Sequence, residues 1–244
     1  MKSLFVVGVL CIGLPIILGL FAGTDLAPPS VEAQELAYEL VIDANQDAWI
    51  EFFNSSQNYG TDRQLIAGGE FPPTGGDIPN EQRILLGFDF QPSNLPPGAV
   101  IVSATLELEQ IGSTGGRVVN LQPDAIFAPW EELTVTWSNQ PSAFNLGDAS
   151  VSVTTVNSLK QWDVTSIVQN WSIGEIDNFG IMVRLPQNTQ FNGTRIFGSR
   201  ENLQTTVPRL RIGYTSPVPP TETPTTETPT ATVTETATAT VTET

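Results

Sequence analysis

The sequence predicts an all-β fold, a β-sandwich or barrel that carries one short helix. Three observations support this prediction. Apolar and polar residues alternate along much of the chain between residues 38 and 215, which is the period of half-buried strands. Gly, Pro, Asn and Asp fill the connecting segments, as is typical of turns. About ten strands of this kind need two packed sheets or a barrel.

The clearest strands lie in the middle of the chain, at residues 83–90 and 100–111. Both show a strict two-residue period. Further short strands are expected at 180–185, 195–198 and 209–214. Leu85 is expected on the outer face of the first long strand. In the two long strands, the residues predicted to face the core are Ile84, Leu86, Phe88, Phe90, Val102, Ala104, Leu106 and Leu108.

One segment has a helical period instead. From Val164 to Trp171, apolar residues occur at positions i, i+3, i+4 and i+7, which predicts a short helix packed by one face. Asp163 is placed to cap its start and Gly174 to end it. A single helix in a strand-rich chain argues against an α/β nucleotide-binding fold, and no Gly-rich phosphate loop follows a strand.

The two ends of the chain differ from the central domain, which is predicted at 38–215. Residues 1–33 are predicted to be an export signal peptide, because Lys2 precedes an apolar run and residues 31–33 suit cleavage. The alternative is an uncleaved membrane anchor, since about 18 apolar residues can span a bilayer. Residues 216–244 are rich in Thr, Pro and Glu and are predicted to be a disordered stalk or linker. These features indicate a secreted or cell-surface bacterial protein.

Composition excludes several classes of function. The net charge of −16 opposes binding to nucleic acid phosphates. There is no His, and the single Cys, Cys11, lies in the apolar leader. Ser-His-Asp catalysis, cysteine-protease chemistry and His/Cys zinc sites are therefore excluded. Contact with glycans, binding of hard cations and carboxylate-only catalysis remain.

Five groups of segments, taken together, resemble a known domain family. In chain order they are Asp47–Ile50 with Asn58–Gly60; Arg83–Asp89 with Leu95–Ala99 and Ser103–Leu106; Trp130 with Val135–Pro141; Trp162–Thr165 with Trp171, Gly174 and Asn178–Gly180; and Ser199–Glu201 with Pro208–Leu210. Together they resemble the DNRLRE domain, also classed as carbohydrate-binding module family 96. The resemblance implies a jelly-roll-like sandwich that binds polysaccharide, with alginate among the ligands of family members. Gly87 stands where the family often has Arg, and the domain has a single Lys, which argues against an acidic polysaccharide here.

Aromatic side chains are the candidates for sugar contact, because their faces stack on the apolar side of a sugar ring. Trp49, Tyr59 and Trp130 are the predicted carbohydrate-binding residues, with a place in the core as the alternative for each. Other aromatic residues in loops or near the start are Phe53, Phe144 and Phe191. The residues predicted to be core, with their ring N–H groups bonded internally, are Trp137, Trp162 and Trp171.

Asp43 and Asp47 are the candidate metal ligands. With Asn45 they place oxygen side chains at alternate positions, as at the start of a calcium loop. Ala48 and Asn54 replace the Gly and Glu that an EF-hand needs, so that motif is excluded. A structural calcium site that combines Asp43 or Asp47 with backbone carbonyls and a distant loop stays open, as does an ordinary solvated turn.

Three Arg residues lie in segments that match the family: Arg83, Arg200 and Arg209. They are expected to pair with nearby carboxylates such as Asp89 and Glu201, since guanidinium groups form strong bidentate pairs. The alternative is an Arg cluster that grips the carboxylates of uronate sugars.

The predicted function is a non-catalytic, extracellular polysaccharide-binding module and not an enzyme. The first alternative is a structural module of the cell surface or matrix that contacts other cell-surface proteins and has no glycan site. The second is a carboxylate-based polysaccharide-degrading enzyme, which needs two acids about 5 to 10 Å apart.

Overall fold

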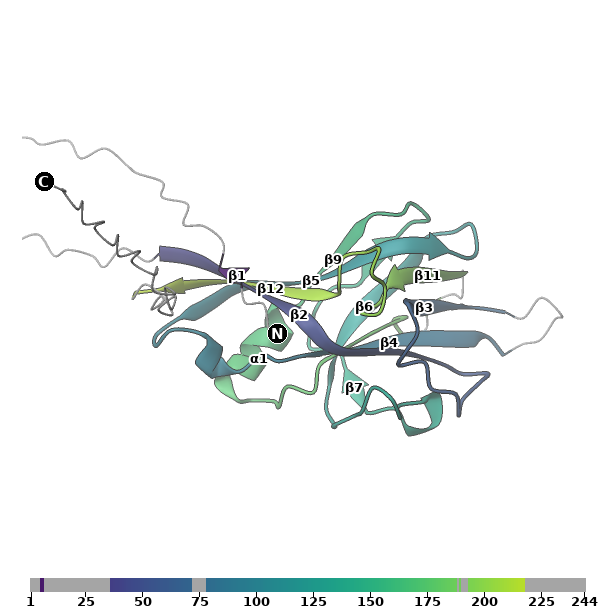
Figure 1. Cartoon of the computed structure of the whole chain (residues 1–244), viewed down its shortest axis with the longest axis horizontal. Coiled ribbons are helices and arrows are strands. Elements are labelled where there is room, and N and C mark those ends of the chain that lie inside the picture. The colour runs from purple at the N-terminus through teal and green to yellow at the C-terminus, as the bar shows by residue number, and fades with distance from the viewer. Residues whose placement is uncertain (1–4, 7–35, 72–77, 188, 190–192, 218–244) are drawn as a thin grey trace, which may run out of the picture.

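The structure, a computed structural model, describes residues 5–6, 36–71, 78–187, 189 and 193–217 (Figure 1). The predicted signal peptide, apart from Phe5–Val6, and the predicted tail, apart from residues 216–217, lie outside these ranges. The strands are β1 (Phe5–Val6), β2 (Leu36–Glu51), β3 (Gln64–Glu70), β4 (Asn80–Phe88), β5 (Val100–Ser113), β6 (Val119–Ile126), β7 (Ala143–Phe144), β8 (Val151–Val153), β9 (Leu159–Asp163), β10 (Ile181–Arg184), β11 (Gly193–Gly198) and β12 (Arg209–Ser216). The helices are α1 (Thr165–Ile173) and the 3-10 turns η1 (Pro92–Asn94) and η2 (Trp137–Asn139). The prediction of an all-β sandwich with one short α-helix is confirmed.

The strands form two antiparallel layers. In the first layer β2 pairs with β12, β12 with β5, and β5 with β9, while β1 adds to the outer edge of β2. In the second layer β4 pairs with β2, β3 and β10. Beyond these, β3 pairs with β11, and β10 leads through β6 to the short strands β7 and β8. In Figure 1, β3 and β4 extend to the right of the body and α1 lies to the left.

Two long strands belong to both layers. The first half of β2 pairs with β12 and its second half with β4, and the change of partner coincides with a bulge between Ala44 and Gln46. The first part of β5 pairs with β12, and its end pairs with β11. The pairing therefore closes on itself through β2, β12, β5, β11, β3 and β4, which leaves few unpaired strand edges.

The core between the layers follows the predicted alternation. The four inward residues of segment 84–90 and three of the four in segment 102–108 are buried there. Trp162 and Trp171 lie in the same cluster, as predicted. Trp162 Nε1 donates to Leu121 O at 3.0 Å. The prediction that the ring N–H is bonded internally is wrong for Trp171, whose buried Nε1 has no hydrogen-bond partner among the described residues. Helix α1 buries Ile167, Val168 and Trp171 against this core.

The ends of α1 match the expectation to within one residue. Val164 occupies the position before the first helical residue, and Asp163 lies one residue earlier. The Asp163 carboxylate accepts hydrogen bonds from the Thr165 amide at 3.0 Å and from the Thr165 hydroxyl at 2.6 Å, so it satisfies an amide that the helix leaves free. Gly174 adopts a left-handed conformation with φ of 71° and ends the helix, as a C-terminal glycine does.

Two predictions about the strands need correction. Val102, predicted to point inward, is exposed, and Ile101 is buried in its place. The cause is a register shift between Gly213 and Tyr214 of β12, which pair with Ser103 and Ile101 and leave Val102 as the extra residue of a bulge.

The second correction concerns the outer face of β4. Leu85, predicted on the face opposite the core, is fully buried. The segment between β6 and β7 folds over this face and forms a second apolar cluster. Its buried members are Ala48, Ile50, Leu85, Ile126, Trp130, Val135 and Met182. Both faces of β4 are therefore covered in its middle part.

Candidate functional site

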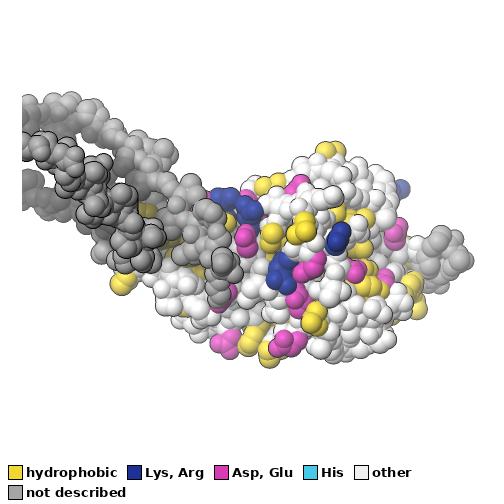
Figure 2. All heavy atoms as spheres, viewed as in Figure 1, with side chains coloured by type: hydrophobic (Ala, Val, Ile, Leu, Met, Phe, Trp, Pro, Cys, Tyr) yellow, Lys and Arg dark blue, Asp and Glu magenta, His cyan; other side chains and the backbone are white. Residues whose placement is uncertain are grey.

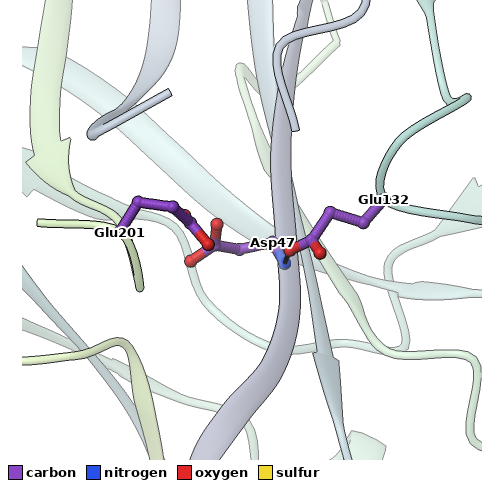
Figure 3. A group of neighbouring side chains, drawn as sticks. All are labelled: Asp47, Glu132 and Glu201. Atoms are coloured by element: carbon purple, nitrogen blue, oxygen red, sulfur yellow. Dashed lines mark hydrogen bonds between the residues drawn. The ribbon is translucent and has the colours of Figure 1, made fainter. Parts of the chain in front are cut away.

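Three segments that are distant in sequence meet around Asp47 of β2. Glu132 comes from the segment between β6 and β7, and Glu201 from the turn after β11. One carboxylate oxygen of each residue lies within 4.8 Å of the others, and Figure 3 shows Glu132 and Glu201 approaching Asp47 from opposite sides. We call these three residues the carboxylate cluster.

Hydrogen bonds hold the carboxylate cluster in place. The Arg200 amide donates to Asp47 Oδ2 at 2.8 Å, and the Asp47 amide donates to Glu132 Oε1 at 2.8 Å. Arg200 Nη2 donates to both carboxylate oxygens of Glu132, at 2.8 and 3.0 Å, and lies 3.4 Å from Glu201 Oε1. One guanidinium therefore balances part of the charge of three carboxylates.

The electrostatic environment of Asp47 is unfavourable to its charged form. The residue is 1% exposed. Burial raises the pKa of the Asp47 carboxyl to about 7, and the nearby Glu201 and Glu132 also act to raise it, while the hydrogen bond from the Arg200 amide acts in the opposite direction. Asp47 is therefore protonated at a higher pH than an ordinary carboxyl, and a bound cation would compete with that proton.

Trp49 and Tyr59 stack on each other at the same end of the sandwich. Their ring centroids are 3.9 Å apart with an interplanar angle of 17°. Trp49 is 8% exposed, and its Nε1 donates to Asp62 Oδ2 at 3.1 Å. Burial, followed by the hydrogen bond to Glu51, raises the pKa of Tyr59 to about 12. Trp49 therefore presents little ring surface to solvent, whereas Tyr59 is half-buried.

Trp130 belongs to the second apolar cluster and is also 8% exposed. Its Nε1 donates to Phe179 O at 2.8 Å. The exposed edge of Trp130 lines a hollow of about 510 Å³ together with Asn45, Gln46 and residues 131–134. The hollow thus adjoins the carboxylate cluster through Glu132.

The loop that carries Tyr59 is locked to the loop that carries Trp130. Asn58 Nδ2 donates to Glu132 O at 2.8 Å and to Val135 O at 2.7 Å. At Gly60 a Cβ atom would lie 2.0 Å from Glu132 O, so this close approach needs glycine. Contacts between these loops therefore bring Tyr59 and Trp130 into one region of the fold.

The whole of this region lies inside a single family match. The model of carbohydrate-binding module family 96 matches residues 39–214. The chain belongs to this family. The resemblance noted in the sequence is thereby confirmed, and membership indicates a carbohydrate-binding module. A search of curated proteins finds no match to the chain.

The family 96 module separates the two predicted metal ligands. Asp43 precedes the β2 bulge and pairs in the sheet with Arg209, whose Nε lies 3.9 Å from Asp43 Oδ1. Asp47 follows the bulge and pairs with Leu86 in the other layer. Asp43 is not a member of the carboxylate cluster.

Two members of the carboxylate cluster were missed by reasoning from the sequence. Glu132 lies two residues after Trp130, and Glu201 ends the segment Ser199–Glu201, so both are in or next to segments that match the family. This resemblance was the only feature of the sequence that could have pointed to Glu132 and Glu201, because neither residue has a characteristic spacing from Asp47 along the chain.

Aromatic rings that are exposed lie elsewhere on the family 96 module. Phe52 and Phe53, just after β2, are 39% and 48% exposed, and Phe144 of β7 is also exposed. Phe191 lies outside the described residues. Trp137 of η2, predicted to be core, is half-buried and packs partly against the second apolar cluster. The reason is that the segment from β6 to β7 covers the sheet from outside, so its aromatic residues have one buried and one outer side.

All three Arg residues named from the sequence form ion pairs in the family 96 module. Arg83 pairs with Glu81, Arg200 with the carboxylate cluster, and Arg209 with Asp43. Figure 2 shows Lys and Arg in a few small groups beside Asp and Glu. These pairs agree with the structural role expected for the three Arg residues.

None of the helices in the described ranges has the length and apolar character needed to cross a membrane.

Proposed function

We propose that this family 96 module binds polysaccharide outside the cell and does not catalyse a reaction. The observation that carries the proposal is the family match, which covers both sheets and every loop of the site region. Residues 39–214 contain no His and no Cys, which removes the commonest general bases and nucleophiles.

A carboxylate-based hydrolase is the less supported function. The carboxylate oxygens of the cluster are close enough for such chemistry, and Asp47 has the raised pKa of a general acid. However, Asp47 is 1% exposed, and Glu132 is tied to Arg200 and to the Asp47 amide. A glycosidic oxygen therefore has no path to the acid.

The first prediction is that the protein is retarded in native gels that contain polysaccharide. The full chain is run in gels with a panel of soluble polysaccharides, with calcium and with a chelator, and reducing sugar is measured in parallel. Retardation by at least one polysaccharide without sugar release is expected. If none retards the chain in either condition, the structural surface module becomes the better account; release of sugar favours the hydrolase.

Trp49, Tyr59 and Trp130 remain proposed sugar contacts. The geometry limits contact with the two indoles to the ring edges that reach the surface, since both are 8% exposed and their N–H groups already have acceptors. Of the three, Trp130 supports the proposal best because it lines the hollow.

We also propose that calcium, when it binds, is held by Asp47, Glu132 and Glu201. Carboxylate oxygens are the ligands that calcium prefers. Glu201 Oε2 is buried and accepts no hydrogen bond from the described residues, so an acceptor is left over at the cluster. Arg200 offsets one of the three negative charges, and a divalent cation would offset the other two.

The second prediction follows from this calcium site. At a hundredfold excess over its dissociation constant, calcium is expected to stabilise the full chain by about 2.7 kcal/mol and so to raise its melting temperature. Magnesium is expected to raise it less. Glu201→Gln should remove the shift, whereas Glu175→Gln, at an exposed acid, should keep it. The measurement is thermal unfolding against added metal. Equal melting curves with calcium and with chelator would rule the site out.

A further inference from the structure

An aromatic platform lies beyond the end of β2. We define it as the side chains of Phe52, Phe53 and Trp137. Phe52 lies 5.8 Å from Phe53 and 5.6 Å from Trp137, measured between ring centroids. Phe52 and Phe53 are 39% and 48% exposed, so apolar ring surface faces solvent beside the sandwich.

Hydrogen bonds to the sandwich hold the backbone that carries the platform. The Phe52 amide donates to Glu81 O, and the Phe53 amide donates to Asn80 Oδ1, both at 3.0 Å. On the other side, the Ser138 amide donates to Ser55 O at 2.9 Å, which joins η2 to the turn after β2. A ligand that binds here therefore loses little affinity to ordering of the backbone.

Polar donors stand beside the rings. The Arg83 guanidinium carbon lies 4.2 Å from the centre of the Trp137 ring. Arg83 Nε donates to Glu81 at 2.8 Å and its Nη1 to Gln140 at 2.7 Å, which leaves Nη2 without a hydrogen bond to any described residue. Trp137 Nε1 likewise donates to no residue in the described part of the chain. Rings flanked by unused donors suit a ligand with an apolar face and hydroxyl edges.

The charge around the platform selects among polysaccharides. Glu81 balances the charge of Arg83, and the chain as a whole carries a net charge of −16. An anionic chain of uronates would meet repulsion without a compensating cation. The platform therefore matches an uncharged chain.

The orientation of the rings selects the physical form of the ligand. Phe52 and Phe53 are inclined by 45°, and Phe52 and Trp137 by 75°. Stacking needs ring faces that lie parallel to the sugar faces. A flat crystalline surface would need coplanar rings, whereas a single chain can twist from one ring to the next.

We propose that the aromatic platform binds a single, uncharged polysaccharide chain. Sugar faces stack on Phe52 and Phe53, and hydroxyl oxygens accept hydrogen bonds from Arg83 Nη2 and Trp137 Nε1. This inference rests on the proposed polysaccharide-binding function and names the surface and the class of polysaccharide.

The third prediction tests the platform with the full chain in native gels. The probes are hydroxyethyl cellulose, galactomannan and mixed-linkage glucan as uncharged chains, and alginate and pectin as uronate chains. The wild type is expected to be retarded by at least one uncharged chain, and Phe53→Ala to bind it about tenfold or more weakly. Phe144→Ala is the matched control, because Phe144 is 59% exposed and contacts Phe127 instead of the platform. Circular dichroism and melting temperature check that both variants fold.

The outcomes separate the platform from the function on which it rests. If the wild type is retarded but both Phe52→Ala and Phe53→Ala bind as tightly, the platform is not the site and polysaccharide binding stands. Retardation by uronate chains alone overturns the uncharged ligand, and pull-down by crystalline cellulose overturns the single chain. If no polysaccharide retards the wild type, the proposed function and the platform fail together.

Discussion

Replacing Arg195 by methionine is expected to lower the free energy of unfolding by about 1 to 3 kcal/mol. Arg195 of β11 is fully buried. Its Nε donates to Val153 O at 3.1 Å, its Nη1 to Thr114 O and Thr194 O at 3.2 and 2.7 Å, and its Nη2 to Arg117 O. Methionine fills much of the volume but leaves these carbonyl oxygens without the donors that Arg195 supplies.

The measurement is urea unfolding at neutral pH. Arg117→Met is the matched control, because Arg117 is exposed and contributes its backbone carbonyl to this network; a change within about 0.5 kcal/mol is expected there. Arg195→Lys should fall between the two, since an ammonium cannot span the same acceptors. An Arg195→Met protein as stable as the wild type would show that these carbonyls need no donor from Arg195.

Replacing Asp47 by asparagine is expected to remove a fall in stability that the wild type shows as the pH rises. Burial raises the folded-state pKa of Asp47 to about 7, above the value of about 3.9 in an unfolded chain. The protonated carboxyl therefore favours folding. Its contribution is fully present below about pH 4 and is lost as the pH rises through about 7, a change of about 4 kcal/mol.

Urea unfolding from about pH 4 to about pH 8, in the presence of a chelator, measures this effect. The chelator matters because a bound cation would take the place of the proton. The difference in stability between the wild type and Asp47→Asn should change across this range, whereas Asp43→Asn, at an exposed acid, should follow the wild type. Parallel curves for all three proteins would contradict the raised pKa.

Local features were predicted well where neighbours along the chain define them. The period of Val164 to Trp171, with Asp163 before it and Gly174 after it, predicts α1 correctly because a helix is built from local contacts. The alternation from Ile84 to Phe90 is equally reliable for the core face. The prediction for Val102 is wrong because the register shift that displaces it lies in the pairing with β12, a strand far along the chain.

The residues of the candidate site show the same difference between features set by neighbours along the chain and features set by distant contacts. Asp47 stands out in the sequence through its spacing from Asp43, yet the structure joins it to Glu132 and Arg200, which are 85 and 153 residues away. The sequence predicts Trp137 to be core and Trp130 to be a surface candidate, but the packing of their common segment leaves Trp137 half-buried and Trp130 largely buried. No period in the sequence distinguishes these two rings.

By itself the sequence determined the all-β class, the single helix, the family, the absence of His from the chain and the absence of Cys from residues 39–214, because periodicity, motif order and composition are properties of the chain. Only the tertiary structure decided which carboxylates meet and which aromatic rings reach solvent. Those outcomes depend on the bulge of β2 after Ala44 and on the segment that folds over β4. Both features depend on contacts between residues far apart in the chain. The free energy of these contacts is gained only when the layers pack.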